Sequence, residues 1–536
     1  MKKLFFLPAL AAMMFSSCSS DEPTVDPSAD QNGDKYMAFS ISNLGGSRAT
    51  AEDDTDYEDA VGTEGNIDAA NLYFLFFDRN GNAFMLEGRT VNGTAVNTNM
   101  VKPTSISTVK DAYGNEKING TLVLGKPAQP FLGQTPAQVL CVANPSTTAM
   151  ANLGSKNLTE VLAVVTRAPN WANGVFLMTN AVYVDGKNVV TATSTQDHIK
   201  NDQGAAEQNP VIINLERAAA KVRVGYKNDY TVNNTAATPS TQTFEVNGTQ
   251  MELHARVYGW RLMNYATTGY GFKHLSATYA DAAFADGWWN DLTKKRSYWA
   301  NSLAGADLTI QQSTYDLYAT GDKDNFTLKS FAAGAPTANI AYCYENTLHQ
   351  GAAATLRTAG ATAFVVKAEI GTVNGTTFTP IDMVKYAGKL YTTAHFNQMI
   401  INQFKSGNAD ATDITVEYVT DYTEKDGVQT PKTDNTFRAI VKYKIDGAER
   451  TFDMGYIYNN FLWWKNGVTS YWQNVKHFAD LTGVVRNHIY DYNITAFNGL
   501  GIPGNNPDTP DEDQSYMAAA LLVLNWRVVS NTVTLE

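Results

Sequence analysis

The sequence predicts an all-β protein made of antiparallel strands that are joined by tight hairpin turns. Aromatic residues make up 11% of the chain and charged residues only 18%, which suits pleated, partly buried strands. Apolar residues alternate with polar ones over short runs, and Asn-Gly or Asp-Gly pairs recur between such runs. Type I′ hairpins need positive φ at both central residues, which Asn, Asp and Gly tolerate.

The turn signal repeats along the chain. The four residues Val-Asn-Gly-Thr occur at 91–94, 246–249 and 373–376, and variants with Asp-Gly occur at 184–187 and 445–448. Each lies between apolar flanks, so each predicts a hairpin. The similarity is one of turn chemistry and does not define a sequence repeat.

Two apolar patterns near the N-terminus predict strands of different burial. Met37, Phe39 and Ile41 alternate with small or polar residues, which is typical of a half-buried strand. Residues 72–77 form a continuous apolar run that the tight-turn sequence at 78–81 closes, which predicts a buried strand.

Helical patterns are few and short. Residues 158–162 follow Asn157, a good N-cap, and predict a short helix. Residues 381–404 are the best longer candidate, although Gly388 weakens it, and 280–292 are a further short candidate. We expect these helices to be insertions on a β scaffold.

Composition marks the boundaries between larger units. Residues 18–34 are polar and rich in Asp, Ser and Pro, which indicates a tether. A long strand-like segment at 210–224 follows a polar loop, and we place a domain junction near it. Residues 502–515 combine three prolines with four acidic residues and predict a linker, beyond which 518–536 are apolar and β-like.

The N-terminus has the pattern of an export signal. Lys2 and Lys3 precede an apolar run at 4–15, which is shorter than the about 20 residues of a membrane-spanning helix. The run ends in a large-small-small-Cys pattern at Cys18 that resembles a lipobox, and the polar, acidic stretch 19–23 follows. We expect Cys18 to be acylated; an ordinary secretory signal with an incidental cysteine is the alternative. No other segment predicts a transmembrane helix.

Charge and motifs argue against nucleic-acid binding and catalysis. The 53 acidic and 41 basic side chains give a formal net charge of −12, which disfavours phosphate backbones as partners. The seven histidines lack metal-ligand spacing, and His488 is interpreted as a structural hydrogen-bonding residue. The loop 499–504 lacks the Lys-Ser/Thr of a phosphate loop, and 30–34 and 322–325 lack full calcium-loop spacing. We therefore expect no catalytic residue, no metal and no cofactor.

Two cysteines remain once Cys18 is set aside. Cys141 lies in the apolar run 139–143, so we expect a buried small hydrophobic side chain rather than a nucleophile. The sequence leaves open whether Cys141 pairs with Cys343.

A cluster of aromatic residues near the C-terminus has two interpretations. Its members are Tyr456, Tyr458, Trp463, Trp464, Tyr471 and Trp472. Such clusters most often fill the core of a β-sandwich, and the alternative is a surface that stacks on sugars.

Five stretches, spread over nearly the whole chain, share features with a known family. They are the lipobox at Cys18, the pair Arg48-Ala49, residues 215–222, residues 483–490 leading to 499–501, and residues 523–529 with Trp526. Together they resemble the fimbrilins of the Bacteroidales type V pilus, and among these the stalk subunits of minor fimbriae. The Arg-Asn-His-x-Tyr stretch and the terminal Trp strand are the most specific, whereas 230–450 match only in general style.

The resemblance implies a fold and a domain organisation. It implies an all-β chain of two antiparallel β-sandwich domains of transthyretin-like build. The expected parts are a lipoprotein signal peptide at 1–17, a propeptide with a removable first strand at 18–48, β-sandwich domains at 49–220 and 221–515, and a C-terminal donor strand at 516–536.

The resemblance also implies a maturation route. A lipoprotein precursor would reach the outer membrane surface, and an Arg-specific protease would cut between Arg48 and Ala49. The strand with Met37, Phe39 and Ile41 would then leave, and a neighbouring subunit's C-terminal strand would fill its groove. The expected partners are further copies of the chain, anchor and tip subunits, the protease, and host or bacterial surface ligands during adhesion, colonisation and virulence.

The C-terminal segment offers apolar residues of two parities. They are Leu522, Leu524, Trp526 and Val528 on one side and Val529, Val533 and Leu535 on the other. The change of parity predicts a bulge or two short strands, and the sequence leaves open which parity would fill a groove. The alternative is that this strand completes its own domain.

Two other roles within surface fimbriae remain open. A tip adhesin or glycan-binding lipoprotein would accept a strand without needing to donate one, so the long apolar C-terminus favours a shaft subunit. A membrane anchor would keep its lipid and lack a processing site, which the pair Arg48-Ala49 argues against.

Overall fold

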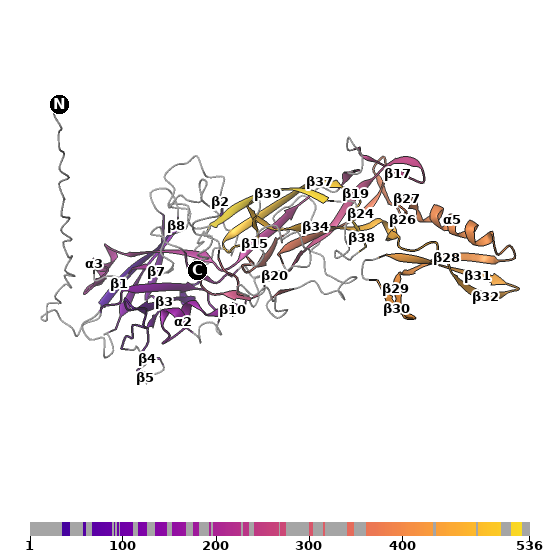
Figure 1. Cartoon of the computed structure of the whole chain (residues 1–536). Helices are drawn as coiled ribbons and strands as arrows, with labels where there is room; N and C mark the ends of the chain where they lie inside the picture. The colour runs from indigo at the N-terminus through magenta and orange to yellow at the C-terminus, as the bar shows by residue number, and fades with distance from the viewer. Residues whose placement is uncertain are drawn as a thin grey trace, which may run out of the picture.

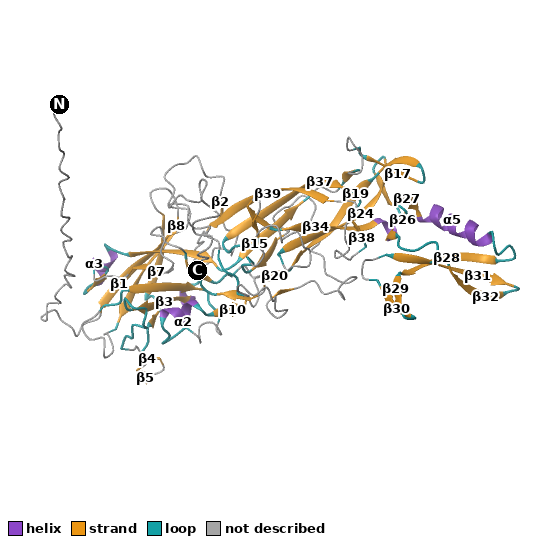
Figure 2. Ribbon diagram, viewed as in Figure 1, coloured by secondary structure: helices purple, strands orange, loops and turns teal. Residues whose placement is uncertain are grey.

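The chain is described here by a computed structural model, shown in Figure 1. The residues that it describes are 35–42, 57–59, 67–87, 90–91, 94–95, 97–110, 116–125, 135–146, 153–167, 175–181, 192–193, 197–226, 229–234, 241–266, 268–274, 300–303, 315–316, 340–347, 361–432, 436–478, 481–504 and 516–527. Strands dominate and helices are few and short, as Figure 2 shows. The prediction of an all-β sandwich fold is confirmed.

The first large sheet contains the N-terminal strands. Its strands, in spatial order, are β6 (Met100–Val101), β3 (Leu72–Phe77), β9 (Gln138–Ala143), β11 (Met178–Asn180), β14 (Val211–Arg217), β1 (Lys35–Ser42), β8 (Glu116–Leu124) and β7 (Ser105–Lys110), with β12 (Ala192–Thr193) beside β9 and β13 (Ile199–Lys200) beside β1. Most pairs are antiparallel, and β1 with β14 is parallel.

This sheet folds over itself to form a sandwich. Phe39 of β1 and Phe74 of β3 lie with ring centroids 4.5 Å apart, although β9, β11 and β14 separate their strands in the sheet. We call the cluster between the two layers the N-terminal core; it consists of buried apolar side chains of β1, β3, β8, β9, β11 and β14 together with Phe84, Leu86, Phe176, Ala219 and Ile489.

The second large sheet contains most of the C-terminal half. Its strands, in order, are β2 (Tyr57–Asp59), β39 (Tyr516–Arg527), β37 (His488–Asn498), β16 (Tyr230–Asn233), β19 (His254–Met263), β24 (Ala363–Asn374), β34 (Val468–Asn474) and β38 (Ile502–Pro503); β15 (Ala220–Gly225) pairs with β37 and with β23 (Ile340–Cys343), and β25 (Thr377–Pro380) pairs with β24.

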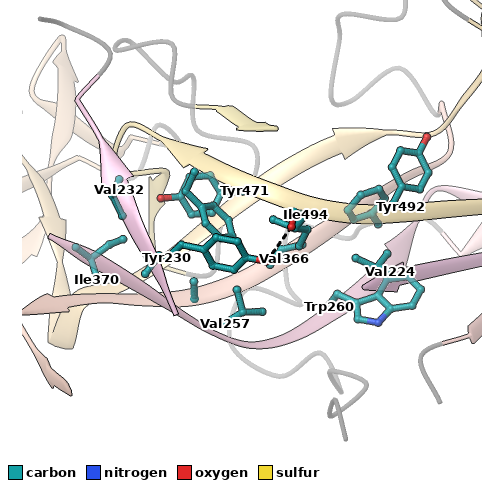
Figure 3. Close-up of a cluster of buried hydrophobic side chains, with 14 of the residues drawn as sticks. Val224, Tyr230, Val232, Val257, Trp260, Val366, Ile370, Tyr471, Tyr492 and Ile494 are labelled. Carbon is teal, nitrogen blue, oxygen red and sulfur yellow. Dashed lines mark hydrogen bonds between the residues drawn. The ribbon is translucent and has the colours of Figure 1, made fainter. Parts of the chain in front are cut away.

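This sheet also closes into a sandwich. Tyr471 of β34 and Phe497 of β37 lie 4.5 Å apart by ring centroid, although three strands separate them in the sheet. The C-terminal core fills the interior (Figure 3); it consists of buried side chains of β15, β16, β19, β23, β24, β34 and β37, with others from β17 (Thr243–Val246), β26 (Met383–Tyr386) and β33 (Leu462–Trp464) of the neighbouring sheet. Within it Trp260 is fully buried, and the Tyr230 hydroxyl donates to the backbone carbonyl of Ile494 at 2.9 Å.

A third unit extends the C-terminal half at its far end in Figure 1. Its sheets are β18 (Thr249–Glu252), β17 (Thr243–Val246), β27 (Lys389–Thr392), β26 (Met383–Tyr386) and β33 (Leu462–Trp464), and then β28 (Thr412–Thr420), β31 (Phe437–Ile445) and β32 (Ala448–Asp453), with helix α5 (Thr393–Lys405) packed on them.

This unit has a hydrophobic core of its own. Phe396, Ile400 and Phe404 of α5 pack against Ala439 and Val441 of β31. Its base is shared with the C-terminal core, because neighbouring residues in β26 and in β33 point into different cores. A separate core here was not foreseen in the sequence.

The remaining elements are short. They are the strand pairs β4 (Thr90–Val91) with β5 (Thr94–Ala95), β10 (Val165–Arg167) with β21 (Thr268–Tyr270), β20 (Tyr265–Ala266) with β22 (Tyr315–Asp316), β29 (Tyr422–Lys425) with β30 (Val428–Pro431) and β35 (Lys476–Phe478) with β36 (Leu481–Thr482), the helices α2 (Leu158–Leu162) and α3 (Gln203–Glu207), and the 3-10 turns η4 (Ala69–Asn71) and η10 (Lys465–Gly467).

The helix expected after Asn157 is confirmed. Asn157 accepts a hydrogen bond from the backbone N–H of Glu160, and the Glu160 carboxylate accepts one from the backbone N–H of Asn157. This reciprocal capping box, with Leu158 and Val161 buried, explains why so short a helix forms.

The longer helix expected over 381–404 is only partly correct. Residues 383–392 form the hairpin β26–β27, and α5 begins at Thr393. Ala387 and Gly388 both have positive φ, which fits a type I′ turn and excludes a helix there. The Thr392 side chain then caps α5 by accepting from the backbone N–H of His395. The candidate helix at 280–292 lies outside the described residues.

Three of the five predicted hairpin turns lie within the described residues; all three are hairpins, and in one the loop residues are shifted by one position. Asn247-Gly248 and Asp446-Gly447 have positive φ at both residues, as type I′ requires. In the 373–376 turn, however, Asn374 pairs with Thr377, so the two loop residues are Gly375 and Thr376. β4 and β5 pair antiparallel with Val91 opposite Thr94, whereas Asn92 and Gly93, like 184–187, lie outside the described residues.

Two further sequence questions have structural answers. Cys141 and Cys343 are both buried and free, so they do not pair with each other. No helix among the described ranges has the length and apolar character needed to cross a bilayer.

Candidate strand-acceptor site

The strand that carries Met37, Phe39 and Ile41 lies inside the first large sheet. β1 pairs with β8 at eight positions, antiparallel, from Lys35 opposite Leu124 to Ser42 opposite Lys117. On its other side β1 runs parallel to β14 at four positions and antiparallel to β13 at two. If β1 left, backbone groups of both β8 and β14 would be unpaired. We call the space that β1 occupies between β8 and β14 the slot.

The slot holds β1 by its apolar side chains. Met37, Phe39 and Ile41 are 0%, 1% and 3% exposed and lie in the N-terminal core. Burying such side chains contributes about 1.5–3 kcal/mol each. The alternation in the sequence therefore identifies the inward face correctly.

The prediction of a half-buried strand is wrong for the other face. Ala38 and Ser40 are 2% and 5% exposed, because the short helix α3 packs against β1 on that side. The Asp202 side chain caps α3, and Glu207 at its end accepts a hydrogen bond from the Thr121 hydroxyl of β8 at 3.1 Å. Small residues face α3, and large ones face the core.

The middle of the slot is shaped for an aromatic ring. Phe39 lies opposite Gly120 in the register, and its ring passes over the glycine. A Cβ placed at Gly120 would lie 2.5 Å from Phe39 Cζ and 2.5 Å from the Ser105 carbonyl oxygen, both too close for any side chain. Phe74 closes the pocket from the opposite layer.

The segment expected to be a donor strand is paired within its own chain. β39 runs antiparallel to β37 at ten positions, and β2 pairs with its outer edge at only three. Leu522, Leu524 and Trp526 lie in β39, whereas Val528, Val529, Val533 and Leu535 lie outside the described residues. In this structure, therefore, the C-terminal strand completes a sheet of its own chain, as the alternative interpretation expected.

The processing and lipidation residues cannot be placed. Cys18, Arg48 and Ala49 lie outside the described residues. β1 ends at Ser42, six residues before Arg48 in the sequence.

Two of the stretches that carry the family resemblance meet where the chain passes between the two large sheets. Leu215 and Ala219 pack in the N-terminal core, while Ala220 and Val222 pack in the C-terminal core. β15 runs parallel to β37 at five positions, beginning with Lys221 opposite Ile489. The segments 215–222 and 483–490 are thus neighbours in space.

Buried charges hold this junction. The Arg486 guanidinium lies 2.7 Å from the Glu345 carboxylate and donates to the backbone carbonyls of Tyr270 and Gly271. Close by, Lys273 Nζ lies 3.0 Å from Glu216 Oε2, with both side chains fully buried. Burial raises the pKa of the Glu216 carboxyl, and the positive charges of Lys273 and Arg486 oppose that rise.

Asn487 joins the two stretches directly. Its backbone N–H donates to the Ala219 carbonyl at 2.7 Å, and its side-chain oxygen accepts from the Arg217 backbone N–H at 3.3 Å. Asn487 has φ of 60°, a left-handed conformation that asparagine tolerates better than most residues. Arg486 and Asn487 of the Arg-Asn-His sequence thus both make structural contacts at the junction.

His488 is a buried neutral side chain. It is 1% exposed, its Nδ1–H donates to the Arg486 carbonyl at 2.7 Å, and its ring lies edge-on to His477 with centroids 4.9 Å apart. Burial, and then the charge of Lys273, lower the pKa of His488 to about 3. In the part of the chain that the structure describes, no three His, Cys, Asp or Glu side chains gather as metal ligands.

The aromatic cluster near the C-terminus is divided between two cores. Trp464 and Tyr471 are 2% exposed in the C-terminal core, and Tyr458 is 7% exposed in the core of the third unit. Trp463 is half-buried against Tyr418, and Tyr456 is exposed. These residues do not form one sugar-stacking face, so the core interpretation is correct for most of them.

Two features of the site were missed from the sequence. Asn119-Gly120 lies between Ile118 and Thr121 and has the composition of a hairpin turn, yet it lies inside β8. The Arg486–Glu345 pair joins residues 141 positions apart, and nothing local in the sequence marks it.

The chain was compared with known proteins. No protein-family model matches it, and no curated protein is similar to it. Among solved structures, a candidate cell adhesion protein from Parabacteroides distasonis ATCC 8503 is 11% identical with a TM-score of 0.39, covering 93% of this chain and 98% of that one.

Two further solved structures are fimbrial proteins of Porphyromonas gingivalis. A fimbrilin from strain W83 is 14% identical with a TM-score of 0.36, covering 94% of this chain and 99% of that one. A tip fimbrial protein is 12% identical with a TM-score of 0.29, covering 92% and 100%. At these values the similarities do not assign the chain to a family.

The close approach at Gly120 makes a stability prediction. We expect Gly120→Ala to destabilise the chain by about 1–3 kcal/mol or to prevent β1 from docking, because the added methyl group would overpack the slot. Gly154→Ala is the matched control, since nothing lies within 4 Å of its added Cβ and it should change stability by less than about 1 kcal/mol. Denaturant unfolding measures both, and equal stabilities would contradict the geometry of the slot.

The buried junction pair makes a second prediction. Arg486→Gln should cost about 3–5 kcal/mol in unfolding free energy, because it leaves the Glu345 carboxylate buried without its partner. Lys442→Gln, which breaks the exposed pair with Glu417, should cost about 1 kcal/mol or less. Similar losses in the two variants would show that the junction charges are not desolvated.

The low pKa of His488 predicts acid sensitivity. An unfolded histidine binds a proton near pH 6.5, whereas folded His488 does not do so until about pH 3. Neutral His488 therefore lowers the unfolding free energy only below pH 6.5, where the unfolded state binds a proton that the folded state does not. As pH falls from 6.5 toward 3, the unfolding free energy decreases by up to about 1.4 kcal/mol per pH unit. Unfolding free energies measured at pH 7 to 4 should show a shallower slope in His488→Gln; an unchanged slope would contradict the assignment.

Proposed function

We propose that this chain is a structural subunit of a fimbrial shaft that polymerises by strand exchange. The precursor fills its own slot with β1, cleavage after Arg48 lets β1 leave, and the C-terminal strand of a neighbouring copy takes its place. Each copy then offers one slot and one strand. Such a head-to-tail contact does not close on itself and grows a filament.

The position of β1 carries this proposal. β1 is an interior strand with neighbours on both sides, yet it is the first described element and lies just upstream of Arg48. A cut at that site separates β1 from everything that follows. Its loss would uncover the apolar pocket of Met37, Phe39 and Ile41 and two strand edges, which together template another strand.

The pairing of β39 supports exchange. β39 has one neighbour along its length and only three paired positions on its outer edge. In the slot the same strand would lie between β8 and β14. β1 is paired at eight positions with β8, four with β14 and two with β13, so the slot offers about as much pairing as β39 has with β37 and β2. Each net main-chain hydrogen bond contributes about 0.5–1.5 kcal/mol, so exchange loses little pairing, and burial of apolar side chains in the pocket that β1 vacates favours it.

The surroundings of the filament come from the sequence resemblance. Cys18 would carry lipid until an Arg-specific protease releases the mature subunit at the outer membrane surface. Anchor and tip subunits would bound the shaft, and the assembled fimbrium would support adhesion and colonisation. The fimbrial descriptions of the solved structures named above agree with this role, but the proposal rests on β1 and the sequence stretches.

Strand exchange predicts a defined outcome for the purified precursor, residues 19–536. Treatment with an Arg-specific protease should give a new N-terminus at Ala49 by sequencing. It should also give a ladder of oligomers on gels that disappears when the sample is boiled, because the subunits are joined without covalent bonds.

A deletion provides the control for that experiment. Removing residues 517–536 should leave the cut at Ala49 unchanged and abolish the ladder, because the slot opens but no donor remains. A clean cut that leaves the full-length protein monomeric would contradict the shaft role.

A further inference from the structure

We infer that the donor strand enters the slot in a single register, in which Leu524, Trp526 and Val528 replace Met37, Phe39 and Ile41 of β1. The inference rests on the proposed strand exchange and deepens it by naming which donor residue fills each position. It also selects one of the two apolar parities of the C-terminal segment.

The slot presents three successive positions of different shape. Met37 lies opposite Leu122, Phe39 opposite Gly120 and Ile41 opposite Ile118. The middle position is the distinctive one. Only there is the facing residue a glycine on which an added Cβ would strike the ring, and only there does a second aromatic ring, that of Phe74, lie 4.5 Å away.

A strand that lacked an aromatic side chain at the middle position would leave a cavity between Gly120 and Phe74. Large-to-small changes at buried aromatic positions cost about 3–5 kcal/mol. The middle position therefore sets the register, because a slip of two residues along the strand would put a different side chain over the glycine.

The C-terminal segment satisfies this requirement in one way. Between 516 and 536 the only aromatic residues are Tyr516 and Trp526, and Tyr516 is followed two positions on by Ala518. Trp526 has Leu524 two residues before it and Val528 two residues after it. This order of a flexible apolar, an aromatic and a β-branched side chain is the order of Met37, Phe39 and Ile41.

The other parity does not offer this match. None of Val529, Val533 and Leu535 is aromatic, so they would place no ring between Gly120 and Phe74 at the middle of the slot. The same-direction alignment also keeps the donor antiparallel to β8 and parallel to β14, as β1 is.

The opposite face of the donor differs from that of β1, and this has a consequence for α3. In the inferred register Asn525 and Arg527 replace Ala38 and Ser40, which are buried beneath α3. Side chains of that size do not fit under the helix as it lies here. We therefore expect α3 to move outward in the filament, with the Glu207 carboxylate available on that face to the Arg527 guanidinium.

A disulfide between copies tests the register. If Val528 replaces Ile41, it lies opposite Ile118 of the neighbouring copy, within the Cα separation that a disulfide spans. After cleavage and mild oxidation, the double variant I118C/V528C should give a ladder that survives boiling and collapses on reduction. Each single variant is a control, because Cys141 and Cys343 are buried and free.

The variant I118C/V529C is the matched control for parity. It should polymerise but give at least tenfold less boiling-resistant ladder than I118C/V528C. The opposite ranking, or a resistant ladder from both in equal amount, would overturn the register while leaving strand exchange intact. A wild-type protein that forms no ladder would instead overturn the proposed function itself.

Substitutions at Trp526 give a second readout that needs no cysteine. Trp526→Phe should keep at least half of the wild-type ladder, because a phenylalanine ring already fits over Gly120 in β1. Trp526→Ala should reduce the ladder at least tenfold, whereas Val523→Ala, on the other parity, should leave it within twofold. Unfolding of each precursor is measured alongside, and wild-type polymerisation by a stably folded Trp526→Ala variant would overturn the inference.

Discussion

The fold depends on β1, an interior strand that is paired on both sides. A cut after Arg48 would leave β1 held to the rest of the chain by noncovalent contacts alone. β1 contributes Met37, Phe39 and Ile41 to the N-terminal core and satisfies the backbone groups of two strands at once. An edge strand can leave a sheet at the cost of one row of hydrogen bonds. When an interior strand leaves, two edges and an apolar pocket face water, so its departure strongly favours the binding of another strand. This constraint links the removal of one strand to the capture of another.

The junction between the two large sheets connects the slot to the strand that pairs with β39. β14, which borders the slot, continues directly into β15, which pairs with β37, the strand that holds β39. Under the proposed exchange, the slot and the donor strand would therefore be joined within one chain by the single continuous segment β14–β15. Lys273 pairs with Glu216 of this segment, and Asn487, next to the buried Arg486–Glu345 pair, bonds the backbone of Arg217 and Ala219. Removing one charge from such a buried pair is costly in unfolding free energy, because it leaves the other charge buried without a partner.

Local sequence patterns predicted those parts of the fold that local chemistry determines. The alternation of Met37, Phe39 and Ile41 identified the inward face of β1, Asn157 identified the start of α2, and Asn247-Gly248 identified a hairpin. Each of these depends on residues within about four positions. The same rules failed where distant parts of the chain decide the outcome. Asn119-Gly120 is part of a strand because the Phe39 ring and the Ser105 carbonyl occupy the space beside it.

Other parts of the site were beyond sequence reasoning for the same reason. Ala38 and Ser40 are buried because α3, more than 160 residues later in the sequence, covers them. Small side chains such as these occur on exposed and buried faces alike, so the sequence pattern gave no sign of their burial. The hairpin at Ala387-Gly388 replaced part of an expected helix, since alanine there adopts positive φ to complete the turn. The separate core around α5 depends on pairing between strands that the sequence pattern could not order.

Backbone hydrogen exchange of β8 and β14 would test the central claim most directly. In the precursor these amides should exchange slowly, because β1 protects both edges. After cleavage of protein that lacks residues 517–536 they should exchange at least tenfold faster, and in the filament of full-length protein they should be slow again. Amides that stay protected after cleavage without a donor strand would show that β1 remains in place, and the account of strand exchange would be wrong.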